Sequence, residues 1–143
     1  MVFTSTATLK PLAPRPVEIA TLSRIGTPSP IAAYFTALNT QDYAVAASCF
    51  APTGQLIPPF ETAIIGPGAI ARYLRKEASG MTFKIEAVQS QGENHYYLRG
   101  KARSPWFNLS VAWDIDLNAQ GAIAQLQIHL LAKPEELLML RPD

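Results

Sequence analysis

The first half of the chain carries apolar residues at helical spacing. Ser29 and Pro30 form a favourable helix start, and apolar side chains then recur every three or four residues. This period predicts three helices, at about 31–38, at 41–50 and from Pro67 onward. We expect the segment between the second and third helices, 55–65, to be extended. Its Pro58-Pro59 pair cannot donate hydrogen bonds to a sheet, which restricts this segment to an edge or a bulge.

The second half of the chain changes to a period of two, which is typical of strands. Four strands are predicted, at about 82–90, 95–103, 106–117 and 122–131. The third is the clearest, because large apolar residues alternate with small or acidic ones. Trp113 should therefore point inward, while Asp114 and Asp116 should lie on the opposite face. Residues 118–121 predict the hairpin that leads into the fourth strand.

The order of these elements predicts an α+β fold. Helices followed by strands favour a curved antiparallel sheet wrapped around the N-terminal helices, as in the cone of nuclear transport factor 2-like proteins. Residues 1–16, with three prolines, are expected to form a flexible N-terminal tail, and 17–143 a single domain closed by a short C-terminal helix from Pro134. This fold is shared by enzymes and binding proteins, so the site must decide the function.

Composition and charge exclude several classes of partner. The net charge is +1, and the scattered Lys and Arg residues form no basic stripe for nucleic acid or an anionic membrane. No apolar run is long enough for a signal peptide or a transmembrane helix, which predicts a cytoplasmic protein without integral membrane insertion. Cys49 is the single cysteine, and we interpret it as a small buried hydrophobe rather than a redox group.

Side chains suited to catalysis or metal binding are few. The two histidines, His95 and His129, have neither a second histidine nor a carboxylate three or four residues later, so no metal site is predicted. The inward positions carry no acid or base, which argues against an enzyme. An enzyme resembling a ketosteroid isomerase or polyketide cyclase remains the alternative, if a turn places Asp42 or His95 inward. A third possibility is a protein-interaction module on the outer sheet face, where Gln125, Gln127 and His129 lie.

Two inward aromatic residues carry polar tips. Tyr34 on the first helix and Trp113 on the third strand are both hydrogen-bond donors that stay neutral at pH 7. Taken alone, such a pair is most often core packing. The same pair also suits holding a carbonyl oxygen in place.

Six stretches of the sequence together resemble the C-terminal domain of the orange carotenoid protein family and its free-standing homologs in cyanobacteria. In chain order they are YFTALNTQD (34–42), FAPTGQLIPPF (50–60), IGPGAIARYLR (65–75), PWF (105–107), VAW (111–113) and LLAKPEELLML (130–140). Each stretch is weak alone, but their combination and order are specific. Two departures are the shorter connection from Phe107 to Trp113 and His129, where the family more often has an acidic residue.

This resemblance implies a function and a set of site residues. The chain would bind a keto-carotenoid of the canthaxanthin or echinenone type without catalysing a reaction. Tyr34 and Trp113 would donate hydrogen bonds to the keto oxygen of the pigment. The tunnel would be lined by Trp106, Phe107, Leu109, Val111 and Ile128.

The resemblance also implies a biological role. The protein would be a carotenoid carrier with a photoprotective, singlet-oxygen-quenching role, forming a homodimer around one pigment and passing it to a separate helical carotenoid-binding domain protein. A carotenoid is a long apolar rod with a polar tip, which requires an apolar tunnel that ends in neutral donors. It is also longer than one 143-residue domain is wide, so a second copy would cover the protruding half.

Overall fold

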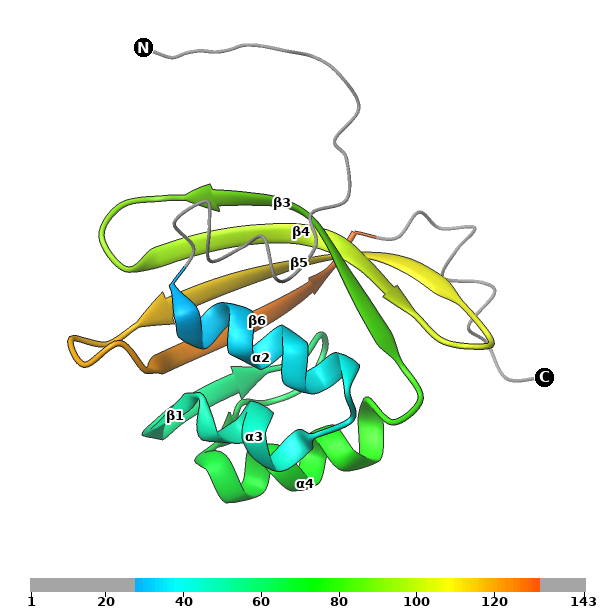
Figure 1. The fold of residues 1–143 in the computed structure, drawn as a ribbon, viewed down its shortest axis with the longest axis horizontal. Coiled ribbons are helices and arrows are strands. Elements are labelled where there is room, and N and C mark those ends of the chain that lie inside the picture. Colours follow the sequence, from blue (N-terminus) through cyan, green and yellow to red (C-terminus); the bar gives the residue numbers. More distant parts are fainter. Residues whose placement is uncertain (1–27, 132–143) are drawn as a thin grey trace, which may run out of the picture.

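A computed structural model describes residues 28–131 of the chain. The elements in chain order are α2 (Ser29–Asn39), α3 (Tyr43–Ser48), β1 (Phe50–Ile57), β2 (Ile64–Ile65), α4 (Pro67–Glu77), β3 (Thr82–Ser90), β4 (His95–Arg103), β5 (Asn108–Leu117) and β6 (Ile123–Leu130) (Figure 1). None of the helices in this part of the chain is long and apolar enough to cross a membrane. The predicted tail 1–16 and the predicted helix from Pro134 lie outside the described residues.

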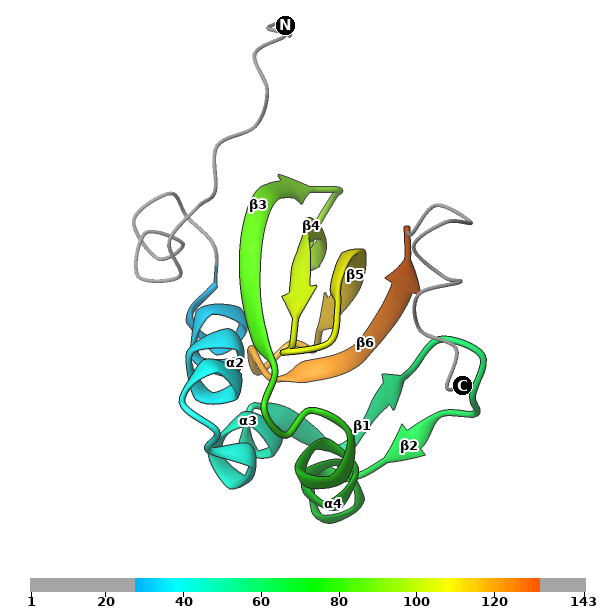
Figure 2. The ribbon, with the colours of Figure 1, turned by 90° about the vertical axis from the view of Figure 1, so that its right-hand side faces the viewer.

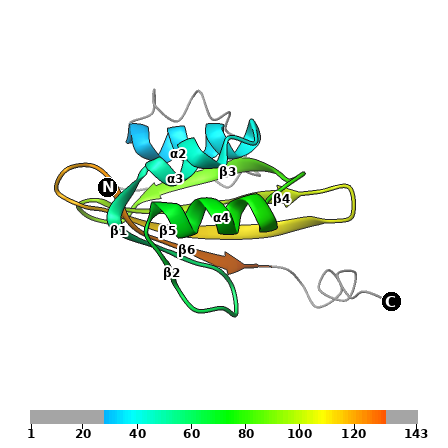
Figure 3. The ribbon, with the colours of Figure 1, turned by 90° about the horizontal axis from the view of Figure 1, so that it is seen from below.

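The strands form one curved, unclosed sheet in the order β2-β1-β6-β5-β4-β3. Figure 2 shows the three helices gathered on one side of this sheet, and Figure 3, seen from below, shows α4 in front of the strands. The prediction of an antiparallel sheet is wrong at one position, because β1 and β6 run parallel and make the sheet mixed. Strand direction is not encoded in the alternation of side chains, and no hairpin joins these two strands.

The element boundaries follow local capping and turn chemistry. β3 and β4 have the predicted limits, whereas β5 begins two residues later than expected because Ser104 N–H donates to the Phe107 carbonyl (2.9 Å) and closes a turn. The second helix is shorter than predicted, because Asp42 caps it by accepting from Val45 N–H (3.2 Å).

Three other sequence-based details differ in the structure. Ser29 is the first helical residue rather than the cap, and Pro28 occupies the cap position without a side-chain hydrogen bond. Pro58 and Pro59 follow β1 instead of lying in a strand, which agrees with their inability to donate to a sheet ladder. The fourth predicted strand is shortened by a residue at each end to Ile123–Leu130.

The hydrophobic core lies between the helices and the inner face of the sheet. Trp113 points inward, as predicted, and its ring packs edge-to-face on Phe35 of α2 at 4.9 Å between centroids. Ile31, Phe35 and Ile115 are fully buried in the same cluster. Burial of each such large side chain contributes about 1.5–3 kcal/mol, so this contact fixes the position of α2 against β5.

A pair of side-chain amides fixes the start of β3 relative to the helices. Asn39 Nδ2 donates to the Phe83 carbonyl (2.9 Å), and Phe83 N–H donates back to Asn39 Oδ1 (2.7 Å). Gln41 accepts from Gly80 N–H (3.1 Å) and donates to the Met81 carbonyl (3.2 Å). These bonds place Met81 and Phe83 where they form one wall of the cavity described below.

Candidate functional site

An apolar cavity of about 190 Å³ lies between α2, α4 and the inner face of the sheet. Its walls come from elements that are far apart in the sequence. The lining residues are Tyr34, Leu38, Pro59, Tyr73, Leu74, Glu77, Ala78, Met81, Phe83, Ala102, Phe107, Leu109, Val111, Trp113, Ile128 and Leu130. The structure therefore brings Tyr34 and Trp113 together with Phe107, Leu109, Val111 and Ile128, six of the seven residues named from the sequence.

Tyr34 and Trp113 are the most buried polar side chains of this cavity, each with 1% of its surface exposed. Burial raises the pKa of the Tyr34 hydroxyl well above its usual value, and the neighbouring Cys49 and Tyr73 raise it further. The hydroxyl therefore stays neutral at physiological pH. Within residues 28–131, neither the Tyr34 hydroxyl nor the Trp113 indole N–H has a hydrogen-bond partner.

Trp106 differs from its expected position. It lies in the turn between β4 and β5 with 82% of its surface exposed, and its backbone N–H donates to Ser104 Oγ (3.1 Å). It is not among the residues that line the cavity. The strand alternation that turns Phe107 inward does not extend through this turn, and the Trp106 ring is directed into solvent.

The sequence did not identify the contribution of α4 to the site. The helical period from Pro67 predicts an apolar stripe of Ile70, Tyr73 and Leu74, with Glu77 on the other side. In the structure both Tyr73 and Glu77 line the cavity. Burial raises the pKa of Tyr73 to about 12, with further contributions from Glu61 and Glu77. Glu77 itself is exposed, at the rim of the cavity. The spacing of four residues could have indicated that the two side chains share a side of α4, but only the fold shows that this side borders the cavity.

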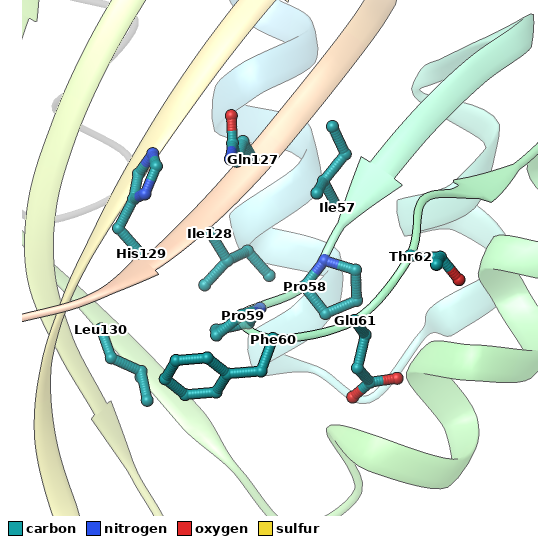
Figure 4. A pocket seen from close by; sticks show the side chains of 10 residues that line it. All are labelled: Ile57, Pro58, Pro59, Phe60, Glu61, Thr62, Gln127, Ile128, His129 and Leu130. Carbon is teal, nitrogen blue, oxygen red and sulfur yellow. The ribbon is translucent and has the colours of Figure 1, made fainter.

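A larger open cleft of about 460 Å³ adjoins the cavity. It is lined by Ile57, Pro58, Pro59, Phe60, Glu61, Thr62, Gln127, Ile128, His129 and Leu130 (Figure 4). The cleft opens because β1 pairs with β6 only as far as Ile57 opposite Gln127, after which the chain leaves the sheet. Pro59, Ile128 and Leu130 border both the cavity and the cleft. The cavity and the cleft therefore share one wall. Apolar surface continues along this wall from the cavity into the open cleft.

Cys49 lies at the end of α3, half-buried and packed against the core. Its Sγ is 3.5 Å from the Val45 carbonyl, to which the thiol donates. Burial raises the pKa of the Cys49 thiol, which disfavours the reactive thiolate. This environment agrees with the predicted packing role.

The two histidines lie on the outer face of the sheet, away from the cavity. His95 Nδ1 is 2.5 Å from Asp116 Oδ1 and His95 Nε2 is 3.1 Å from Asp114 Oδ1, while His129 Nε2 is 2.9 Å from Asp114 Oδ2. The hydrogen bond to Asp116 has the largest effect and raises the pKa of His95. Burial, the next largest effect, lowers it, and the hydrogen bond to Asp114 and the charges of both carboxylates raise it, so the net direction is upward. A chain of four polar side chains thus crosses three strands. The sequence rule of looking three or four residues ahead could not find it, because the partners are opposite one another across strands.

The residues that the enzyme alternative needed do not enter the cavity. Asp42 caps α3, and His95 is bound to Asp114 and Asp116 on the outer face. Among the described lining residues, Glu77 is the one carboxylate. Residues 28–131 contain no group of three or more His, Cys, Asp or Glu side chains arranged to hold a metal ion. The prediction that no acid or base borders the pocket is thus wrong at Glu77, because α4 brings this carboxylate to the rim.

Comparison with known proteins places this geometry in a family. The family model for the SnoaL-like domain matches residues 31–109. An orange carotenoid-binding protein from Limnospira maxima is 33% identical over 122 residues, which cover 80% of this chain and 38% of that protein. The chain therefore spans less than half the length of this relative.

Solved structures agree with this assignment. The orange carotenoid protein of Anabaena (Nostoc) sp. PCC 7120, whose structure is described as binding canthaxanthin, has 33% identity and a TM-score of 0.65, with 79% of this chain and 39% of that chain covered. A putative polyketide cyclase from Sinorhizobium meliloti has a TM-score of 0.64 over 79% of this chain and 100% of its own, but at 21% identity it supports the fold alone. The chain belongs to the SnoaL-like domain family with a nuclear transport factor 2-like fold, and its predicted similarity to orange carotenoid proteins is confirmed.

Proposed function

We propose that this protein binds the end ring of a keto-carotenoid, of the canthaxanthin or echinenone type, in the 190 Å³ cavity. The observation that carries the proposal is the pair of fully buried, neutral donors, Tyr34 and Trp113, on the wall of an apolar space. A carbonyl oxygen has two lone pairs and accepts from both. The similarity to orange carotenoid proteins, one of them described as binding canthaxanthin, supports the same ligand class.

The size of the cavity fits one ring of such a ligand. An apolar cavity of roughly 150 Å³ holds a benzene molecule, whereas pockets that enclose a whole drug-sized molecule have roughly 300–1,000 Å³. The cavity therefore takes the ring, and the polyene must leave it. The adjoining cleft, with Pro59, Ile128 and Leu130 on the shared wall, offers apolar surface in continuity with the ring site.

The protein residues act by binding and polarisation. Tyr34 and Trp113 would orient the ring and draw electron density toward the keto oxygen, while the apolar lining excludes water. The bound pigment would supply the visible absorption. Because Tyr34 stays neutral, this arrangement suits a carrier with a photoprotective role rather than proton transfer.

We propose that two copies of the chain enclose one pigment. Phe60 and Trp106 are 91% and 82% exposed, and each is adjacent in sequence to a residue that lines the cavity, Pro59 and Phe107. These two exposed aromatic side chains and the protruding polyene together form apolar surface. A second copy of the chain would bury this surface. Light scattering on the pigmented protein tests this proposal. A coloured species with the 15.6 kDa mass of one chain would contradict it.

A helical carotenoid-binding domain protein is the proposed recipient of the pigment. This chain spans only 38% of the Limnospira protein, so that relative has further sequence in which such a domain would lie. Mixing the pigmented protein with such a helical domain and following the absorption band after separation of the two proteins tests transfer. A band that stays entirely with this protein would contradict the carrier role.

The central experiment is titration of the pigment-free protein with canthaxanthin and, separately, with β-carotene, which lacks keto groups. We expect tighter binding of canthaxanthin and a visible band to the red of the free pigment, because the hydrogen-bonded keto group extends conjugation. Equal affinity for both pigments would remove the reason for assigning Tyr34 and Trp113 their role.

An isomerase or cyclase acting on a cyclic ketone is the second candidate, favoured by Glu77, whose carboxylate lines the rim of the cavity. Such an enzyme would use Glu77 to remove a proton next to the ketone. Deuterium exchange into a cyclic ketone that the wild-type chain accelerates and a Glu77→Gln variant does not would support this candidate.

A further inference from the structure

We propose that Tyr73 is a specificity-determining residue of the cavity, and that it hydrogen-bonds a hydroxyl group next to the keto group on the bound ring. The inference rests on the proposed function and extends its ligand class to end rings of the 3-hydroxy-4-keto type. The sequence motifs assigned no role to this residue beyond the apolar stripe of α4.

Tyr73 lines the same cavity as Tyr34 and Trp113 but belongs to a different element, α4. Its position on this helix is fixed by two neighbours, since Ile70 and Leu74 are 0% and 3% exposed in the core. The ring of Tyr73 is half-buried and packs against the same cluster. A hydroxyl at this position is therefore held by a rigid element rather than by a loop.

The Tyr73 hydroxyl is available to a ligand in its neutral form. Burial raises its pKa, as do Glu61 and Glu77, so the phenol stays protonated at neutral pH. Among residues 28–131 its hydroxyl has no hydrogen-bond partner. Tyr34, Tyr73 and Glu77 all line the one cavity, Tyr34 fully buried and Glu77 exposed at the rim.

The number of donors exceeds what a keto oxygen can use. The oxygen accepts two hydrogen bonds, which Tyr34 and Trp113 supply, and Trp113 can only donate. Tyr73 both donates and accepts, which is what a hydroxyl group requires of its partner. A hydroxyl on the carbon next to the carbonyl lies on the same edge of the ring, and burying it without a partner would be unfavourable. Tyr73 supplies this partner.

The experiment compares canthaxanthin with astaxanthin, which carries this hydroxyl on each of its two keto rings, on the wild-type protein and two variants. In a Tyr73→Phe variant we expect astaxanthin affinity to fall roughly two- to tenfold, the value of one hydrogen bond. Canthaxanthin affinity should stay within about twofold. The matched control is Tyr97→Phe, because Tyr97 lies opposite Asp114 on the outer face of β4 and should affect neither pigment.

The outcomes separate this inference from the proposed function. Equal loss of both pigments in Tyr73→Phe would show that the residue only packs, and unchanged affinity for both would show that it does not contact the hydroxyl. Either result overturns the inference while the wild-type protein still binds keto-carotenoid. A wild-type protein that binds neither pigment overturns the proposed function as well.

Discussion

Trp113 and Asp114 are neighbours on β5 but meet opposite environments. On the inner face, the Trp113 N–H is buried in an apolar cavity without a partner among the described residues. On the outer face, Asp114 is partly exposed and binds both His95 and His129. The outer-face carboxylate is thus paired with histidines of the two neighbouring strands, whereas the inner-face indole forms part of the cavity wall.

The largest contrast between the two faces should appear in stability. Trp113→Ala removes a fully buried ring and its contact with Phe35, and we expect it to lower the free energy of unfolding by about 3–5 kcal/mol. Asp114→Asn keeps the shape of the outer-face residue and serves as the matched control, with a loss of no more than about 1 kcal/mol. Urea unfolding followed by circular dichroism measures both. Comparable losses of unfolding free energy in the two variants would contradict the contrast between a buried inner face and a partly exposed outer face of β5.

Ligand binding should separate donor chemistry from packing on the inner face. Tyr34→Phe and Trp113→Phe keep an aromatic ring and remove one donor each, so each should weaken canthaxanthin binding roughly two- to tenfold and shift its band to the blue. The double variant leaves the keto oxygen unsatisfied and should not bind the pigment stably. Circular dichroism of the pigment-free variants checks the fold. Unchanged affinity and colour in the double variant would leave Tyr34 and Trp113 as packing residues.

The pH dependence of stability should report the pairing of His95 with carboxylates on the outer face. The pKa of His95 is raised from its usual value of 6.5, first by Asp116, so protonated His95 stabilises the folded chain. This contribution is complete below pH 6.5 and is lost as pH rises through the higher folded pKa. Because the pair is partly exposed, we expect no more than about 1 kcal/mol. His95→Gln should flatten the pH dependence of the unfolding free energy in this window, and an unaltered profile would show that His95 is not its source.

The smallest effect is expected at the second tryptophan. Trp106 is 82% exposed, so Trp106→Ala should change the free energy of unfolding of the pigment-free protein by less than about 0.5 kcal/mol. The same variant should weaken pigment-induced dimerisation if a second copy covers this side. A large loss of stability in the monomer would show that Trp106 packs against the domain.

The sequence predicted those features that depend on local periodicity. Tyr34 and Trp113 are inward because helical and strand periods place them with other large apolar residues, and both positions are confirmed. Features that depend on register across strands were missed, since nothing in a single strand shows that His95 lies opposite Asp116. Trp106 was assigned by resemblance, but the turn that contains it breaks the alternation. Tyr73 was predicted to lie on the apolar stripe of the helix from Pro67, but its place in the cavity depends on how α4 packs against the sheet.

The parallel pairing of β1 with β6 has a consequence for folding. β3 to β6 pair with their sequence neighbours, whereas Leu56 pairs with Leu126, about half the chain away. Contacts between distant segments form slowly, because a long loop must close before they contribute. We expect the β3–β6 meander to form before β1 docks. Destabilising substitutions at Leu56 should then mainly speed unfolding, whereas those at Leu98 should slow refolding, which stopped-flow fluorescence would measure. Docking of β1 completes the border of the cleft, so the site would become able to bind only in the last step.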